Sequence, residues 1–192
     1  MITALAGLIT WYVLPKKENH ENPENKWVYS AIGQAGRSLK VWLMAFMIVC
    51  AYVGYKITDD YSLYANVVLG FNEVNAAKFG GYALWLRPVF AVMAGVFADR
   101  YSASRILSVC FAISFVGGGL IFTDVVHFSL PLVVMVLAST LAGIYGIRGI
   151  YFAVVQESKI SIHTTGATIG IISLLGFTPD IFMSPLMGYL LD

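Results

Sequence analysis

Five apolar segments, each long enough to cross a lipid bilayer as a helix, constrain this chain more than any other feature. An α-helix rises about 1.5 Å per residue, so roughly 20 apolar residues cross the hydrocarbon core of a bilayer. The segments are apolar on most faces and lack the alternation of membrane β-strands. We therefore predict an all-α, polytopic transmembrane helix bundle. The predicted spans are residues 39–58, 73–98, 106–123, 130–156 and 166–190.

Composition agrees with lipid as the solvent. The chain is 58% hydrophobic and 12% charged, whereas a typical soluble domain is about 25% charged. Cys50 and Cys110 both fall in apolar runs, which indicates buried thiols rather than a disulfide framework. No zinc-ligand spacing, phosphate-binding loop or nucleophile motif occurs, so we expect no metal, no cofactor and no enzymatic activity. The expected environment is a bilayer, and we expect no nucleic-acid partner.

The N-terminal region divides into two parts. Residues 1–15 are apolar but too short to span, and no positive charge precedes them as in a signal peptide. We predict that they are the end of a truncated transmembrane helix. Residues 16–38 are charged and are predicted to form a cytoplasmic loop between two bundles. Residues 39–192 are predicted to form the C-terminal transmembrane bundle.

Basic residues are unevenly divided between the two sides of this topology, and the richer side is expected to be cytoplasmic. Residues 16–38, 99–105 and 157–165 are therefore predicted to be cytoplasmic, in a multi-pass protein of the inner (plasma) membrane. The basic residues on the cytoplasmic side are Lys16, Lys17, Lys26, Arg37, Lys40, Arg100, Arg105 and Lys159, against Lys56 and Lys78 on the other side.

A loop motif stands between the second and third predicted spans, with the sequence GVFADRYSASR over residues 95–105. It resembles the loop signature of the major facilitator superfamily, a glycine four residues before Asp-Arg with basic residues after it. Ser102 and Ala103 depart from the glycine and the basic residue that the family often has there. The resemblance implies a latch between two halves of a transporter at the cytoplasmic side, formed by Gly95, Asp99, Arg100 and Arg105.

The resemblance extends to the order of the spans. The family has twelve spans in two bundles of six, joined by a long cytoplasmic loop. A helix that ends inside, a charged loop and five further spans match helices six to eleven of that arrangement. This implies the C-terminal half of such a transporter, truncated at both ends. An N-terminal bundle and a twelfth helix would be absent, and the N-terminal bundle is the expected partner.

Two arginines fall within predicted spans, where a charge costs roughly 2.5–3.5 kcal/mol on insertion scales. Arg87 lies near the middle of its span and can bind an anion through two parallel hydrogen bonds. It resembles the central arginine of the nitrate and organic-anion branches of the superfamily. A structural ion pair is the alternative. Arg148 can line the same cavity, pair with a carboxylate, or extend to the cytoplasmic interface. Tyr52 and Tyr55 can contact the substrate or serve as packing.

Asp180 lies in the last predicted span between Pro179 and Pro185. Prolines free backbone carbonyls and kink a helix, and a carboxylate at this depth can exchange protons. We predict that Asp180 couples protons to transport. The alternatives are a salt bridge with Arg87 or Arg148, or a position closer to the exterior of the membrane.

The predicted function is secondary transport of a small, anionic solute by alternating access. The alternative is an inactive truncated membrane protein, or a helical membrane scaffold that transports nothing. Glycines are expected to allow close packing between spans. They are Gly117, Gly118, Gly119, Gly143, Gly146, Gly149, Gly166 and Gly170.

Overall fold

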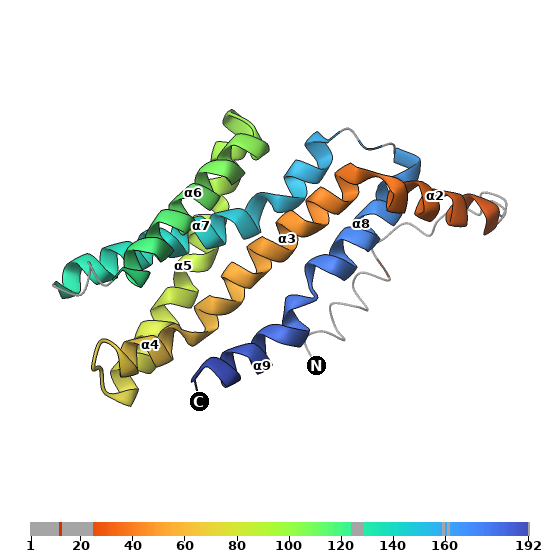
Figure 1. The fold of residues 1–192 in the computed structure, drawn as a ribbon. Helices are drawn as coiled ribbons and strands as arrows, with labels where there is room; N and C mark the ends of the chain where they lie inside the picture. The colour runs from red at the N-terminus through yellow and green to blue at the C-terminus, as the bar shows by residue number, and fades with distance from the viewer. Residues whose placement is uncertain (1–11, 13–24, 124–128, 159, 161, 192) are drawn as a thin grey trace.

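The computed structural model describes residues 12, 25–123, 129–158, 160 and 162–191, and every regular element in this part of the chain is a helix (Figure 1). The predicted all-α fold is therefore confirmed. The prediction for residues 1–15 lies outside the described residues apart from Tyr12, and the predicted loop 16–38 is described from Asn25 onward. The elements are α2 (Asn25–Arg37), α3 (Leu39–Ile57), the 3-10 turn η1 (Thr58–Asp60), α4 (Tyr61–Val67), α5 (Glu73–Arg100), α6 (Ala103–Phe122), α7 (Leu130–Glu157), α8 (Ile162–Gly176) and α9 (Pro179–Leu191).

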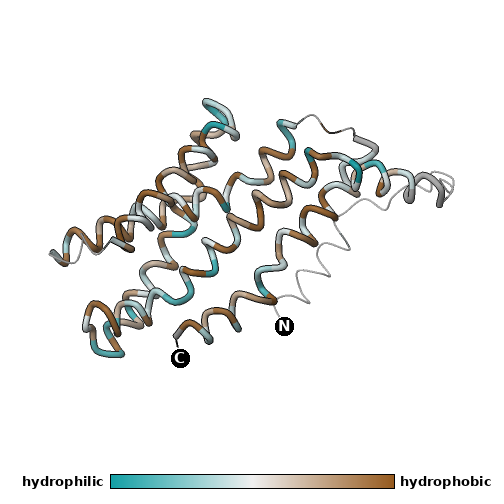
Figure 2. Tube along the Cα trace, viewed as in Figure 1, coloured by the Kyte–Doolittle hydropathy of each residue, from teal (hydrophilic) through white to brown (hydrophobic). Residues whose placement is uncertain are grey.

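Five segments are long and apolar enough to cross a membrane. Figure 2 shows hydrophobic residues along most of their length and hydrophilic residues at the turn that joins α5 to α6. Large apolar side chains are exposed to the surroundings, as lipid permits, including Phe46 (66%) and Phe115 (84%). The protein is a polytopic helical membrane bundle. Its spans are Leu39–Val67, Glu73–Arg100, Ala103–Phe122, Leu130–Glu157 and Thr164–Leu190.

The first span continues beyond residue 58, where the sequence predicts its end. The hydroxyl of Thr58 donates to the carbonyl of Tyr55 (2.7 Å), and Lys56 pairs with Asp59 at 2.9 Å. These local bonds satisfy polar groups at the helix end and carry the chain through η1 into α4. The aspartates that suggest a loop are thus accommodated within a nearly continuous helix.

Helix α7 lies at the centre of the bundle and is its most buried span. It packs against α5 and α6 on one side and against α3 on the other, while α8 and α9 run along α3 (Figure 1). The side chain of Tyr145, halfway along α7, is fully buried. The α3, α5 and α7 side chains considered below therefore come from neighbouring helices.

Glycines explain how α5 and α6 approach α7 so closely. A Cβ atom at Gly143 would lie 2.7 Å from the carbonyl oxygen of Cys110, and one at Gly149 would lie 2.9 Å from that of Ala91. Backbone atoms cannot move aside as flexible side chains can, so these positions require glycine. The predicted close packing is confirmed at Gly117, Gly143, Gly146 and Gly149. It is wrong at Gly118, Gly119, Gly166 and Gly170, where no described atom lies within 4 Å of the added Cβ.

Candidate functional site

Two arginines from different helices lie against one tyrosine ring. The guanidinium carbon of Arg148 (α7) is 3.9 Å from the ring centroid of Tyr55 (α3), and that of Arg87 (α5) is 4.6 Å from the same centroid. Arg148 also lies 5.2 Å from the ring centroid of Tyr52. Four of the residues that the sequence assigns to the substrate site are thus brought together by three helices.

The site lies near the middle of the spans. Arg87 is 14 residues after Glu73 and 13 before Arg100, the ends of α5. Arg148, placed by sequence in the cytoplasmic half of its span, contacts the same ring as Arg87 and therefore lies at a similar depth. Its side chain contacts aromatic rings instead of extending to the helix end.

Neither arginine forms a salt bridge within the described part of the chain. The salt bridges there both involve Lys56, which contacts Asp59 and Asp180. The Nη1 atom of Arg148 is buried and has no hydrogen-bond partner among the described residues. An unpaired buried donor of this kind is costly in an apolar medium. The structural ion pair that was the alternative for Arg87 is not observed in these residues.

Repulsion between the two guanidinium groups adds to this cost. Their carbons are separated by at most the sum of 3.9 and 4.6 Å, because both lie against Tyr55. At an effective dielectric constant of about 20, two like charges at that distance repel by about 2 kcal/mol. Contact with an aromatic face stabilises each cation by about 0.5–2 kcal/mol but does not neutralise its charge. The arrangement therefore favours an anion between or beside the two groups.

Asp180 lies at a break in the last span. Helix α8 ends at Gly176 and α9 begins at Pro179, and the hydroxyl of Thr178 donates to the carbonyl of Leu175 (2.7 Å) within the interruption. Asp180 is in the first turn of α9, and its side chain is half exposed. Pro179 cannot donate a backbone hydrogen bond to α8, and the backbone N–H groups of Asp180 and Ile181 donate to the carbonyls of Phe177 and Thr178 within the interruption.

Both carboxylate oxygens of Asp180 have partners on α3. The hydroxyl of Tyr52 donates to Oδ2 at 2.9 Å, and Nζ of Lys56 lies 3.5 Å from Oδ1. The salt bridge of Asp180 is thus to Lys56 and not to either arginine. Tyr52 contacts Asp180 through its hydroxyl and Arg148 through its ring, so it connects the carboxylate to the arginine pair. Sequence reasoning missed Lys56 as a partner of Asp180, because it counted Lys56 only among the basic residues of the non-cytoplasmic side.

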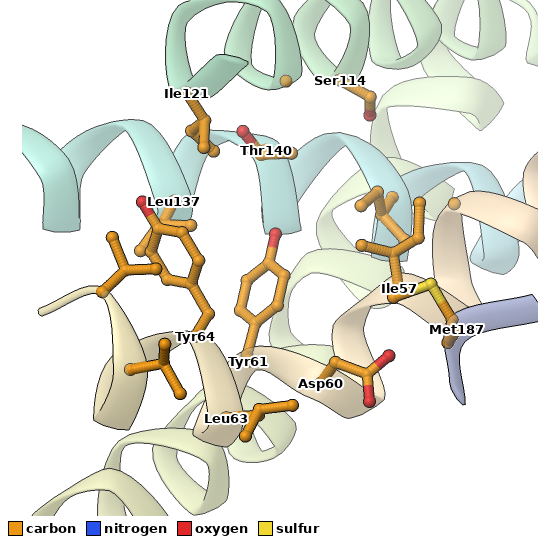
Figure 3. Close-up of a pocket in the computed structure, with 15 residues that line it drawn as sticks. Ile57, Asp60, Tyr61, Leu63, Tyr64, Ser114, Ile121, Leu137, Thr140 and Met187 are labelled. Atoms are coloured by element: carbon orange, nitrogen blue, oxygen red, sulfur yellow. The ribbon is translucent and has the colours of Figure 1, made fainter. Parts of the chain in front are cut away.

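A separate cavity of about 460 Å³ lies between α4, α6 and α7 (Figure 3). Tyr61 and Tyr64 point from α4 toward α7 across it. Its lining is almost entirely apolar, and Asp60 is the charged residue in it. This cavity is unsuited to an anion because it offers a carboxylate and no cation, and neither Arg87 nor Arg148 lines it.

The loop motif lies at the turn between α5 and α6. Asp99, Arg100 and Arg105 are exposed, and no ion pair joins them to other described residues. No described atom lies within 4 Å of a Cβ added at Gly95. The role of these four residues as a latch therefore stays a prediction, because it would require contact with another bundle.

Glu157, which sequence reasoning placed at a solvated end, caps a neighbouring helix. Its Oε1 accepts from the backbone N–H of Ala103 (2.6 Å), and its Oε2 accepts from the backbone N–H and the hydroxyl of Ser104 (3.1 and 2.7 Å). The first amides of a helix lack internal partners and favour a negative charge. Glu157 thus joins the end of α7 to the start of α6. Glu157 is more than 50 residues away from Ala103 and Ser104 in the sequence, so no local sequence pattern predicts this contact.

Replacing Glu157 with glutamine is expected to weaken this cap, because the charge and one acceptor oxygen are lost. Hydrogen–deuterium exchange at the amides of Ala103 and Ser104 should become several-fold faster in the detergent-solubilised chain. The matched control is Glu73→Gln, since Glu73 is exposed and accepts no hydrogen bond from another helix in the described part. Unchanged exchange at both amides would contradict the cap.

Among the described residues, no group of three or more His, Cys, Asp or Glu side chains is arranged to hold a metal ion.

Comparisons with known proteins agree with the assignment of this chain to the membrane proteins. No protein-family model and no solved structure matches the chain. It is 26% identical over 206 residues to the inner membrane protein YihN of Escherichia coli (strain K12), covering 100% of this chain and 48% of YihN. It is 21% identical over 204 residues to the inner membrane protein YqcE of the same organism, covering 100% of this chain and 47% of YqcE. The chain spans about half the length of the curated relatives it matches. With its five apolar spans, these similarities support a multi-pass membrane protein.

Proposed function

We propose that this chain forms the solute-binding part of a secondary transporter that moves a small anion across the inner membrane by alternating access. The observation that carries the proposal is the pair Arg87 and Arg148, which share the ring of Tyr55 at mid-span without a carboxylate partner in the described residues. Intramembrane ionisable groups are costly and usually serve a solute or ion pathway.

Three further observations support the transporter class. The loop over residues 95–105 resembles the signature of the major facilitator superfamily. Broken helices near the midplane are a common feature of transporter binding sites, and α8 and α9 form such a helix. The relatives are inner membrane proteins about twice as long as this chain. A second bundle of similar size would supply the other wall of the site, with residues 16–38, 99–105 and 157–165 on the cytoplasmic side.

Within this proposal, the loop motif is the contact between the two bundles. Gly95 offers open space for an approaching helix, and Asp99, Arg100 and Arg105 offer exposed charges at the turn. Asp180 is the proton-coupling group. Its contact with Tyr52 provides a path by which its charge acts on Arg148.

Uptake into proteoliposomes tests the proposal. The chain is reconstituted alone and together with a six-span chain that supplies the other bundle, and entry of labelled sulfate and nitrate is measured under a proton gradient. We expect uptake of at least one anion in the combined preparation. Absence of both binding and uptake in the combined preparation would leave a non-transporting scaffold as the function.

The same assay separates coupling from translocation. Asp180→Asn should abolish uptake driven by the proton gradient, because its side chain cannot take up a proton, but should retain exchange of labelled for unlabelled anion. The control is Asp60→Asn, since Asp60 lines the apolar cavity and forms no described salt bridge. Gradient-driven uptake by Asp180→Asn at the unaltered rate would remove Asp180 from coupling.

A further inference from the structure

We propose that the anion bound between Arg87 and Arg148 carries two negative charges, as in sulfate, a phosphate monoester or a small dicarboxylate. This inference rests on the proposed function and specifies its substrate class. It begins from the local charge. Two guanidinium groups lie against one ring, and each lacks an acidic partner in the described residues.

Two acidic groups beside the end of α3 are already engaged. Asp180 uses one carboxylate oxygen for Lys56 and the other for Tyr52. Asp59 is held by Lys56 at 2.9 Å, toward the end of α3. These carboxylates therefore cannot move onto the arginines without breaking their own bonds, and both guanidinium groups remain without a carboxylate in direct contact.

The shape of the two donors also suits such a ligand. A guanidinium group donates from a planar fork and binds a pair of oxygens on one anion. Two forks that come from different helices need two pairs of oxygens. A tetrahedral oxyanion or a dicarboxylate presents two pairs with two charges, whereas a single carboxylate presents one pair with one charge.

A count over the connected charges links this ligand to proton coupling. Arg87, Arg148 and Lys56 are positive, while Asp59 and Asp180 are negative, so the five groups together carry a single positive charge. A doubly charged anion makes the sum negative by one, and one proton on Asp180 restores neutrality. A singly charged anion neutralises the group by itself and would bind without a proton. Under the proposed proton coupling at Asp180, the doubly charged ligand is therefore the one whose binding is accompanied by a proton.

Binding of sulfate and nitrate to the full chain in detergent tests the charge of the ligand. Both are inorganic oxyanions of fixed charge between pH 5 and 8. We expect calorimetry to show that sulfate binds at least tenfold more tightly than nitrate. Binding of sulfate should be accompanied by the uptake of one proton, and this proton uptake should be absent in Asp180→Asn. Arg148→Gln should abolish binding of both. Lys78→Gln, which removes an exposed positive charge on α5, should leave the binding of both unchanged.

A phosphate monoester gives an independent readout, because its second ionisation lies near pH 6. The ratio of methyl phosphate affinity to sulfate affinity should rise as pH increases from 5 to 7, and sulfate corrects for titration of the protein. Nitrate binding as tight as sulfate, still lost in Arg148→Gln, would overturn the doubly charged ligand and leave anion transport in place. Failure of every anion to bind both to the chain alone and to the chain combined with a second bundle would overturn the proposed function itself.

Discussion

Replacing Arg148 with alanine should weaken anion binding at least a hundredfold, about 3 kcal/mol. The guanidinium group of Arg148 is one of two that lie against Tyr55, and its buried Nη1 has no partner among the described residues. Arg148→Lys keeps the charge but loses the planar fork, so its affinity should fall between those of the native chain and the alanine variant. Calorimetric titration with sulfate measures all three.

The stability of the anion-free chain gives a second readout for the same position. A partly buried charge without an acidic partner carries a desolvation cost that its contacts with Tyr52 and Tyr55 offset only in part, so Arg148→Met, which has a similar length, should raise stability in the absence of anion by about 1 kcal/mol. The thermal unfolding midpoint in detergent reports this change. Loss of stability in Arg148→Met by more than the roughly 2 kcal/mol of an aromatic contact would contradict the site, because it would indicate that Arg148 has a structural partner besides Tyr52 and Tyr55.

Placing a methyl group on Gly143 should destabilise the bundle by about 2–3 kcal/mol. The new Cβ would lie 2.7 Å from the carbonyl oxygen of Cys110, which belongs to the backbone of α6 and cannot move alone. Helix α6 would have to shift away from α7, the central helix. The thermal unfolding midpoint of Gly143→Ala in detergent measures the loss.

Gly118→Ala is the matched control for this substitution. It lies on α6, the helix that Gly143 of α7 packs against, but no described atom lies within 4 Å of its added Cβ. Alanine favours the helix over glycine by up to about 1 kcal/mol, so this variant should be neutral or slightly stabilised. Equal destabilisation by both substitutions would show that the effect is not contact with Cys110.

Residue type and order along the chain were enough to predict the spans. A segment within a membrane must satisfy its own backbone hydrogen bonds, so an apolar run of sufficient length forms a membrane-spanning helix. This requirement applies to each segment separately, so the hydropathy of the sequence is enough to locate the spans. The same reasoning marked Arg87, Arg148 and Asp180, because a charge within an apolar run is conspicuous without any knowledge of its neighbours.

The partners of these charges depended on tertiary structure. Asp180 pairs with Lys56 and accepts a hydrogen bond from Tyr52, although the sequence suggested the arginines as its partners. Glu157 caps α6 from the end of α7. Such contacts depend on the rotation and depth of each helix, which packing between helices determines. Four glycines of eight make close contacts for the same reason.

The sequence by itself determined that this protein is a bundle of membrane-spanning helices with charges at mid-span. Lipid imposes that result on each segment separately, because an apolar run of helix length is stable there without reference to the rest of the chain. Tertiary structure alone decided that Arg87 and Arg148 meet at Tyr55 while Asp180 joins Lys56. The reason is that a charge interacts over a few ångströms, and only the packed helices set which groups come within that range.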